Sequence, residues 1–282
     1  MNIPTVKLRN NVEMPRIVLG TFQHNNRDEL RDLIKSALQI GYRAFDTAPS
    51  YRNEEVLGSI FEELIADGEV TRGDLFLIDK IDGWQMQQSN GNITEYVEAA
   101  LSKLRVNYLD LLLIHWPFPE WLVKTWESCI AANKSGIVKS IGLCNVHERH
   151  LLSVVDNTEF TPDVVQVERH PLNSMSGLVA LNEELGIITQ AYSPVCRMID
   201  KLSSSPIIAG IAEKHGRSKG QVIMRWHIDT GVVPVFMTTR SERLEEYKKI
   251  FDFHLDASDL SKISMLNENY KIFLESRGCP GF

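Results

Sequence analysis

Short apolar runs alternate along this chain with longer segments in which apolar residues recur every three or four positions. The short runs predict strands and the longer segments predict helices with one buried face. Arg27–Ile40 is the clearest helix, with Asn26 as its expected N-cap, Glu29 completing a capping box and Gly41 at its end. The other expected helices are Asn53–Asp67, a segment capped by Asn92 and Glu95, Trp121–Ala132, and segments near His147–Val155, Ser176–Leu185, Pro206–His215, Ser218–Asp229 and Arg243–Phe251.

The expected strands are nearly all apolar, as in parallel sheets that are buried on both faces. Eight strand–helix units in one chain predict an α/β fold, a (β/α)8 TIM barrel. Leu8–Pro15 precedes the first barrel strand and predicts an N-terminal β-hairpin that caps the bottom of the barrel. No linker divides the chain, so residues 1–282 are expected to form a single domain. The expected strands are Ile17–Thr21, Tyr42–Asp46, Leu75–Lys80, Leu109–His115, Val138–Leu143, Val164–Val167, Ile187–Ala191 and Val232–Phe236.

Polar residues end three consecutive strands of this barrel. Asp46, Lys80 and His115 end the second, third and fourth strands, and Tyr51 lies in the loop after the second. Active sites of such barrels lie at the C-terminal ends of the strands, so these four side chains are expected to converge.

The four side chains suit proton donation. A free tyrosine has a pKa of about 10, and a cation in contact with it can lower that pKa by roughly 1–3 units. Lys80 is the candidate cation, and Asp46 is the partner that a buried ammonium needs. His115 can orient a carbonyl oxygen by a hydrogen bond. A hydride from a nicotinamide would complete the reduction.

Ordered motifs along the chain carry a family resemblance. They are Leu8–Pro15, Leu19–Thr21, Gly41–Tyr51 followed by Asn53–Gly58, Ile114–Pro117, Gly142–Asn145, Gln166–Pro171, Ala191–Pro194 and Phe251–Phe253. Together they resemble the aldo-keto reductase family over nearly the whole chain.

This resemblance implies an NAD(P)H-dependent carbonyl reductase that transfers a hydride to an aldehyde or ketone. It implies Tyr51 as the acid/base, Lys80 and Asp46 as the residues that tune it, and His115 as the residue that orients the substrate. Asn145 and Gln166 would hold the nicotinamide carboxamide, Tyr192 would stack on its ring, and Gly20, Thr21 and Ser193 would contribute to the cofactor cleft.

The chain departs from the family where the cofactor's 2′-phosphate would bind. Met237 stands in place of the usual lysine, while Thr238 keeps a hydroxyl and Arg243 stands where a second phosphate-binding cation belongs. We therefore expect NADPH, held through Arg243 with help from Arg240, and allow NADH because Met237 carries no charge. Two further departures are Cys144 in place of a serine and Tyr247 in place of an asparagine.

Few residues separate His115 from the next expected helix, and the tail after Tyr270 is short. We expect an open substrate pocket that suits aldehydes, aromatic carbonyls or ketoesters. Its expected edges are Phe22, Trp84, Trp116 and Phe118.

The chain carries 30 Lys and Arg against 37 Asp and Glu, a net charge of −7 that argues against binding nucleic acid. Four widely spaced cysteines form no Cys-x-x-Cys pair, and His147 and His150 are three apart rather than four, so we expect no metal. The start lacks the apolar run of a signal peptide and no stretch is long enough to span a membrane. We expect a soluble, cytoplasmic monomer whose partner is a small carbonyl compound.

Two other functions compete with this interpretation. One is a catalytically weak cofactor-binding or regulatory barrel protein of the same fold, against which the four intact residues argue. The other is an aldolase in which Lys80 forms a Schiff base. That role needs a neutral amine, whereas Asp46 would keep Lys80 charged.

Overall fold

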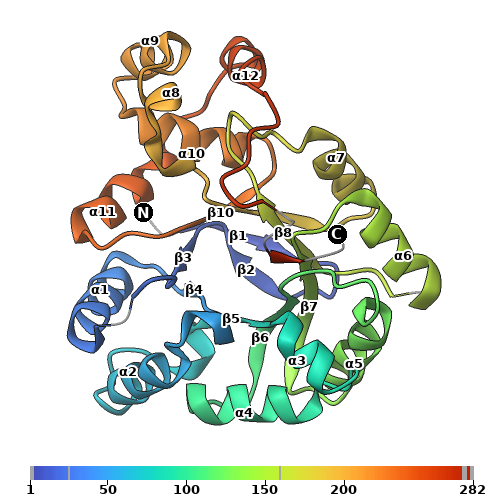
Figure 1. Ribbon diagram of the computed structural model, residues 1–282. Coiled ribbons are helices and arrows are strands. Elements are labelled where there is room, and N and C mark those ends of the chain that lie inside the picture. The colour runs from blue at the N-terminus through green and yellow to red at the C-terminus, as the bar shows by residue number, and fades with distance from the viewer. Residues whose placement is uncertain (1–2, 25, 159, 275–277, 280–282) are drawn as a thin grey trace.

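Eight parallel strands close into a barrel in the order β10-β3-β4-β5-β6-β7-β8-β9. The computed structural model describes residues 3–24, 26–158, 160–274 and 278–279, so both ends of the expected domain lie outside the described residues. Figure 1 shows the helices arranged around this central ring of strands. The predicted (β/α)8 barrel is confirmed. The strands are β3 (Val18–Gly20), β4 (Ala44–Asp46), β5 (Phe76–Ile81), β6 (Leu109–Ile114), β7 (Val138–Cys144), β8 (Val164–Glu168), β9 (Ile188–Tyr192) and β10 (Val233–Phe236).

The helices follow the predicted pattern closely, and the caps explain where α1 begins and ends. Asn26 accepts hydrogen bonds from the backbone of Asp28 and Glu29, and Gly41 ends the helix with φ of 111°. The helix expected after Asn92 begins at Thr94, with Ile93 rather than Asn92 as its N-cap. The helices are α1 (Arg27–Ile40), α2 (Glu54–Ala66), α3 (Gly83–Gln88), α4 (Thr94–Leu104), α5 (Leu122–Lys134), α6 (Glu148–Thr158), α7 (Ser176–Glu184), α8 (Asp200–Ser203), α9 (Pro206–His215), α10 (Lys219–Asp229), α11 (Ser241–Lys248) and α12 (Ala257–Ser264).

Helices α3, α8 and α12 were not expected. With six and four residues, α3 and α8 are too short to display a helical repeat. Within the part of the chain that the structure describes, no helix is both long enough and apolar enough to cross a membrane.

The predicted N-terminal hairpin is confirmed, although its first strand lies earlier than expected. β1 (Thr5–Lys7) pairs antiparallel with β2 (Glu13–Pro15), and the turn between them contains Leu8. Leu8 and Met14 pack in the same buried cluster as residues that line the inside of the barrel. The Asn10 side chain donates to the carbonyl oxygen of Lys139 near the start of β7. The hairpin therefore closes the bottom of the barrel and leaves the opposite end for the site.

Candidate active site

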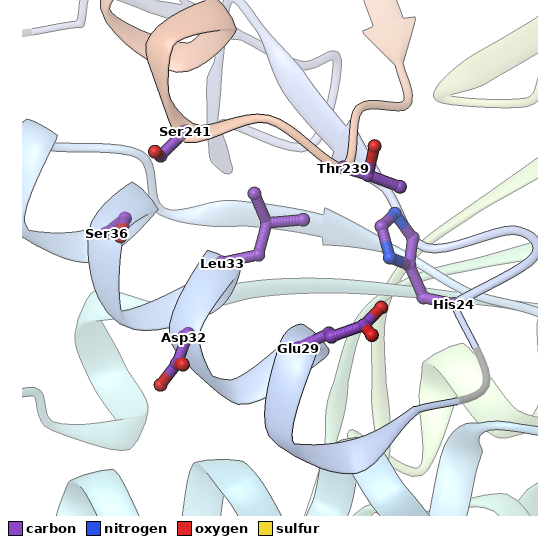
Figure 2. A pocket seen from close by; sticks show the side chains of 7 residues that line it. All are labelled: His24, Glu29, Asp32, Leu33, Ser36, Thr239 and Ser241. Carbon is purple, nitrogen blue, oxygen red and sulfur yellow. The ribbon is translucent and has the colours of Figure 1, made fainter.

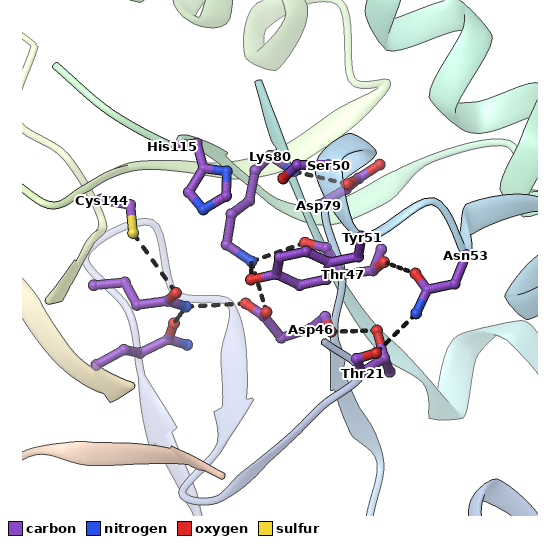
Figure 3. A network of polar contacts seen from close by, with 12 residues as sticks. Thr21, Asp46, Thr47, Ser50, Tyr51, Asn53, Asp79, Lys80, His115 and Cys144 are labelled. Atoms are coloured by element: carbon purple, nitrogen blue, oxygen red, sulfur yellow. Dashed lines mark hydrogen bonds and ion pairs between the residues drawn. The ribbon is translucent and has the colours of Figure 1, made fainter. Parts of the chain in front are cut away.

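Lys80 is the centre of a polar network at the top of the barrel (Figure 3). Its side chain is fully buried, with the residue 1% exposed. Its Nζ atom donates to Asp46 Oδ1 at 2.6 Å and to the carbonyl oxygen of Thr47 at 2.8 Å. The same atom lies 3.3 Å from the hydroxyl oxygen of Tyr51. The structure thus brings three of the four predicted residues into direct contact.

Neighbouring strands explain this convergence. Asp46 is the last residue of β4, Lys80 lies one residue before the end of β5, and the two strands pair in parallel. Tyr51 ends a 3-10 turn that begins at Pro49, whose fixed φ suits the first helical position. Thr21 supports Asp46, because both its backbone N–H and its hydroxyl donate to the Asp46 carbonyl oxygen.

The protonation states of this group follow from burial and charge. Burial alone would lower the pKa of Lys80, but the Asp46 carboxylate and Tyr51 outweigh it and leave the pKa above its ordinary value. Lys80 is therefore a cation. Burial raises the pKa of Tyr51, and Lys80 opposes this effect without cancelling it. The expected lowering by Lys80 is present, but desolvation of the phenol is the larger effect.

His115 follows β6 directly and its ring lies beside the Tyr51 ring, with the two ring centroids 6.1 Å apart. Its Nδ1 atom contacts Asp82 Oδ1 at 2.5 Å. The sequence interpretation did not include Asp82. A signal was present, since residues two apart on a strand point to the same side and Asp82 follows Lys80 by two.

The residues expected to hold the nicotinamide form a second network that touches the first. The Tyr192 hydroxyl donates to Asn145 Oδ1 at 2.7 Å, and Asn145 Nδ2 donates to the His115 carbonyl oxygen at 2.9 Å. Gln166 Nε2 donates to Asp46 Oδ2 at 3.0 Å. The Cys144 Sγ atom lies 3.7 Å from Gln166 Oε1. These side chains lie on β7, β8 and β9 or, for Asn145, directly after β7. The polar contacts that begin at Lys80 therefore continue around the barrel to β9.

The remaining residues of the expected cleft lie at strand ends beside these networks. Gly20 ends β3, and a Cβ atom there would lie 3.4 Å from the carbonyl oxygen of Phe236 on β10. Ser193 follows β9 with φ of 50°, which turns the chain sharply after Tyr192. Such a Cβ atom would make an ordinary van der Waals contact, so Gly20 packs against β10 next to Thr21 without an unusually close approach of the two strands.

The loop expected to meet the cofactor's phosphate carries few free cations. Met237 is 45% exposed, and the buried Thr238 hydroxyl accepts from the backbone N–H of Arg240 at 3.1 Å. Arg243 Nη1 lies 3.1 Å from Glu246 Oε2, and its guanidinium is 5.5 Å from the centre of the Tyr247 ring. Part of the Arg243 charge is therefore already compensated by a carboxylate.

A cavity of about 280 Å³ lies between helix α1 and this loop (Figure 2). Glu29 and Asp32 line it from α1, Thr239 lines it from the loop, and Ser241 lines it from the start of α11. Two carboxylates make this cavity unsuited to a phosphate group. Its remaining lining residues are His24, Leu33 and Ser36.

Of the four residues expected to edge the substrate pocket, Phe22 lies near Tyr51 and Trp116 lies near the tail. The Phe22 ring lies 5.0 Å from the Tyr51 ring, centroid to centroid. Phe118 packs on Gly83, and Trp116 packs on Gly278. Trp84 is 49% exposed, and its ring contacts Tyr96 on α4 at 5.5 Å.

The C-terminal tail contributes to the site, which the expectation of an open pocket overlooked. The buried Glu168 carboxylate accepts hydrogen bonds from the backbone N–H groups of Ile272 and Phe273, at 2.6 and 2.8 Å. The Phe273 ring then lies 5.7 Å from the Tyr192 ring. The tail therefore lies against the residue expected to stack on the cofactor and, through Gly278, against Trp116.

With this geometry in place, comparison with known proteins decides the family. The model of the Aldo/keto reductase family matches residues 16–268. The chain belongs to the aldo/keto reductase family. The expected resemblance is confirmed, and with it the expectation of an NADP-dependent oxidoreductase that acts on carbonyl groups.

Relatives of this aldo-keto reductase include enzymes named for small dicarbonyl substrates. The chain is 34% identical over 273 residues to methylglyoxal reductase DkgA of Escherichia coli O157:H7, covering 96% of each protein. It is 37% identical over 268 residues to a glyoxal reductase of Bacillus subtilis (strain 168), covering 95% of this chain and 94% of that one. A crystal structure of an aldo-keto reductase of Bombyx mori in complex with NADP superposes with a TM-score of 0.90 at 29% identity, covering 98% of this chain and 97% of that one.

Proposed function

We propose that this aldo-keto reductase reduces small aldehydes and ketones to alcohols, short dicarbonyl compounds among them, with Tyr51 as the proton donor. The observation that carries the proposal is the contact of the buried Lys80 ammonium with the Tyr51 hydroxyl, in a site where Asp46 compensates the charge of Lys80. The names of the two bacterial relatives support the dicarbonyl class.

The nicotinamide cofactor would supply the hydride that the carbonyl carbon receives, and the chain supplies the proton that the carbonyl oxygen needs. Tyr51 remains protonated near neutral pH because burial keeps its pKa above the ordinary value. As negative charge develops on the substrate oxygen, Tyr51 can pass its proton there, and Lys80 stabilises the phenolate that is left. Such a donor contributes about 10²–10⁴ in rate.

The residues of β7, β8 and β9 fit a nicotinamide. Asn145 and Gln166 offer the amide groups that a carboxamide requires, and Tyr192 offers an aromatic face beside them. Gly20, Thr21 and Ser193 would line the rest of the cleft. Gln166 donates to Asp46, and Tyr192 is joined through Asn145 to the carbonyl oxygen of His115, so a ring on Tyr192 would lie beside the proposed catalytic group.

For the 2′-phosphate we propose Thr238 and Arg243, with help from Arg240. Met237 adds no charge, and Glu246 already pairs with Arg243. NADPH should therefore bind more tightly than NADH, but by a smaller margin than a lysine at position 237 would give. A binding titration with both cofactors tests this, and tighter NADH binding would overturn the preference.

We propose Phe22, Trp116 and Phe118 as walls of the substrate pocket, with Trp84 at its outer edge. Phe22 lies next to the Tyr51 ring, so the substrate carbonyl would reach Tyr51 from this side. We expect a monomer, and sedimentation velocity would detect any larger assembly.

The aldolase alternative is disfavoured because Lys80 is held as a cation by Asp46, and a Schiff base requires a neutral amine. The proposed function is tested with Tyr51→Phe, assayed by oxidation of NADPH in the presence of a panel of aldehydes. We expect turnover to fall by roughly 10²–10⁴ while NADPH binding is kept. Tyr96→Phe is the matched control, because it removes an exposed hydroxyl on α4.

Full activity in Tyr51→Phe would show that another group donates the proton. If the unaltered protein binds NADPH and turns over no carbonyl compound of the panel, the cofactor-binding or regulatory alternative gains support instead.

A further inference from the structure

A carboxylate that belongs to neither the Lys80 pair nor the expected cofactor residues touches the ring of His115. Asp82 follows β5 and is 6% exposed, and its Oδ1 atom lies 2.5 Å from His115 Nδ1. The Ser50 hydroxyl donates to the same oxygen at 3.3 Å. The backbone N–H of Asp82 donates to the side-chain oxygen of Gln85 at 2.8 Å, which fixes the backbone from which the carboxylate extends.

The fold holds the histidine as firmly as the carboxylate. The backbone N–H of His115 donates to the Ile81 carbonyl oxygen at 2.9 Å, which sets the end of β6 beside the residue before Asp82. On its other side, the carbonyl oxygen of His115 accepts from Asn145 Nδ2. The contact between the two side chains is therefore built by neighbouring strands.

The charge of Asp82 decides which ring nitrogen carries a proton. Burial would raise the pKa of Asp82, but the hydrogen bonds from His115 and Ser50 outweigh burial and hold that pKa below its ordinary value. Asp82 is then an ionised acceptor near neutral pH, so His115 Nδ1 must carry a proton. A neutral ring in this state has a bare lone pair on Nε2 and can donate a hydrogen bond from Nε2 only after it gains a second proton.

We propose that Asp82 is a positioning residue that orients His115 and favours its doubly protonated form, so that Nε2 presents an N–H group to the substrate oxygen. This inference rests on the proposed carbonyl reduction, in which Tyr51 still gives the proton. A charged donor aimed at the oxygen stabilises the negative charge that develops there during reduction.

Other titratable groups of the described residues lie at this end of the barrel. Tyr51 faces the ring and is neutral, and Lys80 is charged but compensated by Asp46 at 2.6 Å. Burial raises the pKa of the Cys144 thiol to about 12, so it is neutral as well. Among these groups, Asp82 is thus the uncompensated charge closest to the ring.

The proposal sets the direction in which kcat/KM for reduction changes with pH. The proposed active form has the extra proton on His115, so kcat/KM for reduction should be constant at low pH and fall as the pH rises through the titration of His115. Asp82→Asn keeps an oxygen that accepts from Nδ1 but removes the charge. The midpoint of the fall should then move to lower pH by about 1–3 units.

The test measures kcat/KM against pH for the unaltered protein, Asp82→Asn and Asp79→Asn. Asp79→Asn controls for the replacement of a buried carboxyl group of β5 by an amide, because Asp79 accepts from the backbone N–H of Lys80 instead of from the ring. Burial holds the pKa of Asp79 well above its ordinary value, so this variant makes the same change of group as Asp82→Asn without the loss of a charge. Asp79→Asn should leave the midpoint in place. If Asp82→Asn does not fold, Asp82→Ser keeps a hydrogen-bonding side chain before α3 without a charge.

Nitrogen NMR of His115 without substrate gives a readout that does not depend on turnover. We expect a proton on Nδ1 and a downward move of the ring titration in Asp82→Asn that matches the move in kcat/KM. An unchanged ring titration would overturn the proposal, as would a moved ring titration with an unchanged kcat/KM profile. If no carbonyl compound is turned over, the proposed reduction fails, and the NMR titration still decides whether Asp82 controls the ring.

Discussion

The Asp46–Lys80 pair offers a way to separate stability from catalysis. At 2.6 Å, the attraction between the two charges is about 6 kcal/mol for an effective dielectric constant of 20. Desolvation costs several kcal/mol for each buried ion, so the pair as a whole contributes little net stability. Removing one partner is different, because the other charge stays buried without compensation.

We therefore expect Lys80→Met and Asp46→Asn each to lower the free energy of unfolding by about 3–5 kcal/mol. In Lys80→Met the Asp46 carboxylate keeps a hydrogen bond from Gln166 Nε2 but loses its cation. The double variant contains neither charge, and it should lie within about 1–2 kcal/mol of the unaltered protein. Its reductase activity should stay as low as that of Lys80→Met, since Tyr51 has lost the ammonium beside it.

Urea unfolding followed by circular dichroism gives the free energies, and steady-state reduction of a small aldehyde gives the activities. Lys201→Met is the control, since Lys201 and its partner Glu268 are about half exposed and such a pair contributes about 0–1 kcal/mol. If the double variant loses the sum of the two single losses, the two charges do not stabilise each other and the reasoning is refuted. Recovered activity in the double variant would equally refute the role given to Lys80.

Two further predictions concern other parts of the molecule. Met237→Lys should tighten NADPH binding by about 10–100-fold, because a charged hydrogen bond contributes about 1.5–3 kcal/mol, and it should leave NADH binding unchanged. A fluorescence titration with each cofactor measures this. Equal effects on both cofactors would place Met237 away from the phosphate. Gly58→Ala should destabilise the protein strongly, because the added Cβ atom would lie 2.1 Å from the backbone oxygen of Lys103. In Gly210→Ala the added Cβ atom meets nothing within 4 Å, so this variant should stabilise α9 by about 0.5–1 kcal/mol. Thermal unfolding of both variants checks this pair, and equal shifts would contradict it.

The sequence was sufficient for the barrel because each strand is buried on both faces and each long helix is buried on one. Both patterns can be read from spacing alone, and the strand ends then placed Asp46, Lys80 and His115 at one edge. Short elements such as α3 carry no such repeat, so their position follows from tertiary contacts. Exact boundaries shifted for the same reason, as in the hairpin, where Leu8 lies in the turn.

The site was predictable where strand order fixes it and less so where loops and the tail decide it. The spacing of Asp82 from Lys80 indicated the side of the barrel on which it lies, but that spacing does not reveal its contact with His115. The direction of Trp84, toward Tyr96 on α4, depends on a short helix that the sequence did not predict. The contact of Phe273 with Tyr192 joins positions about eighty residues apart, and only the fold brings them together.

The link between Glu168 and the tail has a consequence for protein engineering. This carboxylate is buried inside the barrel wall, and two of its hydrogen-bond donors are backbone groups of Ile272 and Phe273. A chain cut before Ile272 would leave Glu168 with His170 as its remaining partner among these contacts. Deleting the tail would therefore leave an inadequately solvated charge in the interior, so trimming or fusing this end should lower the yield of folded protein as well as alter the pocket.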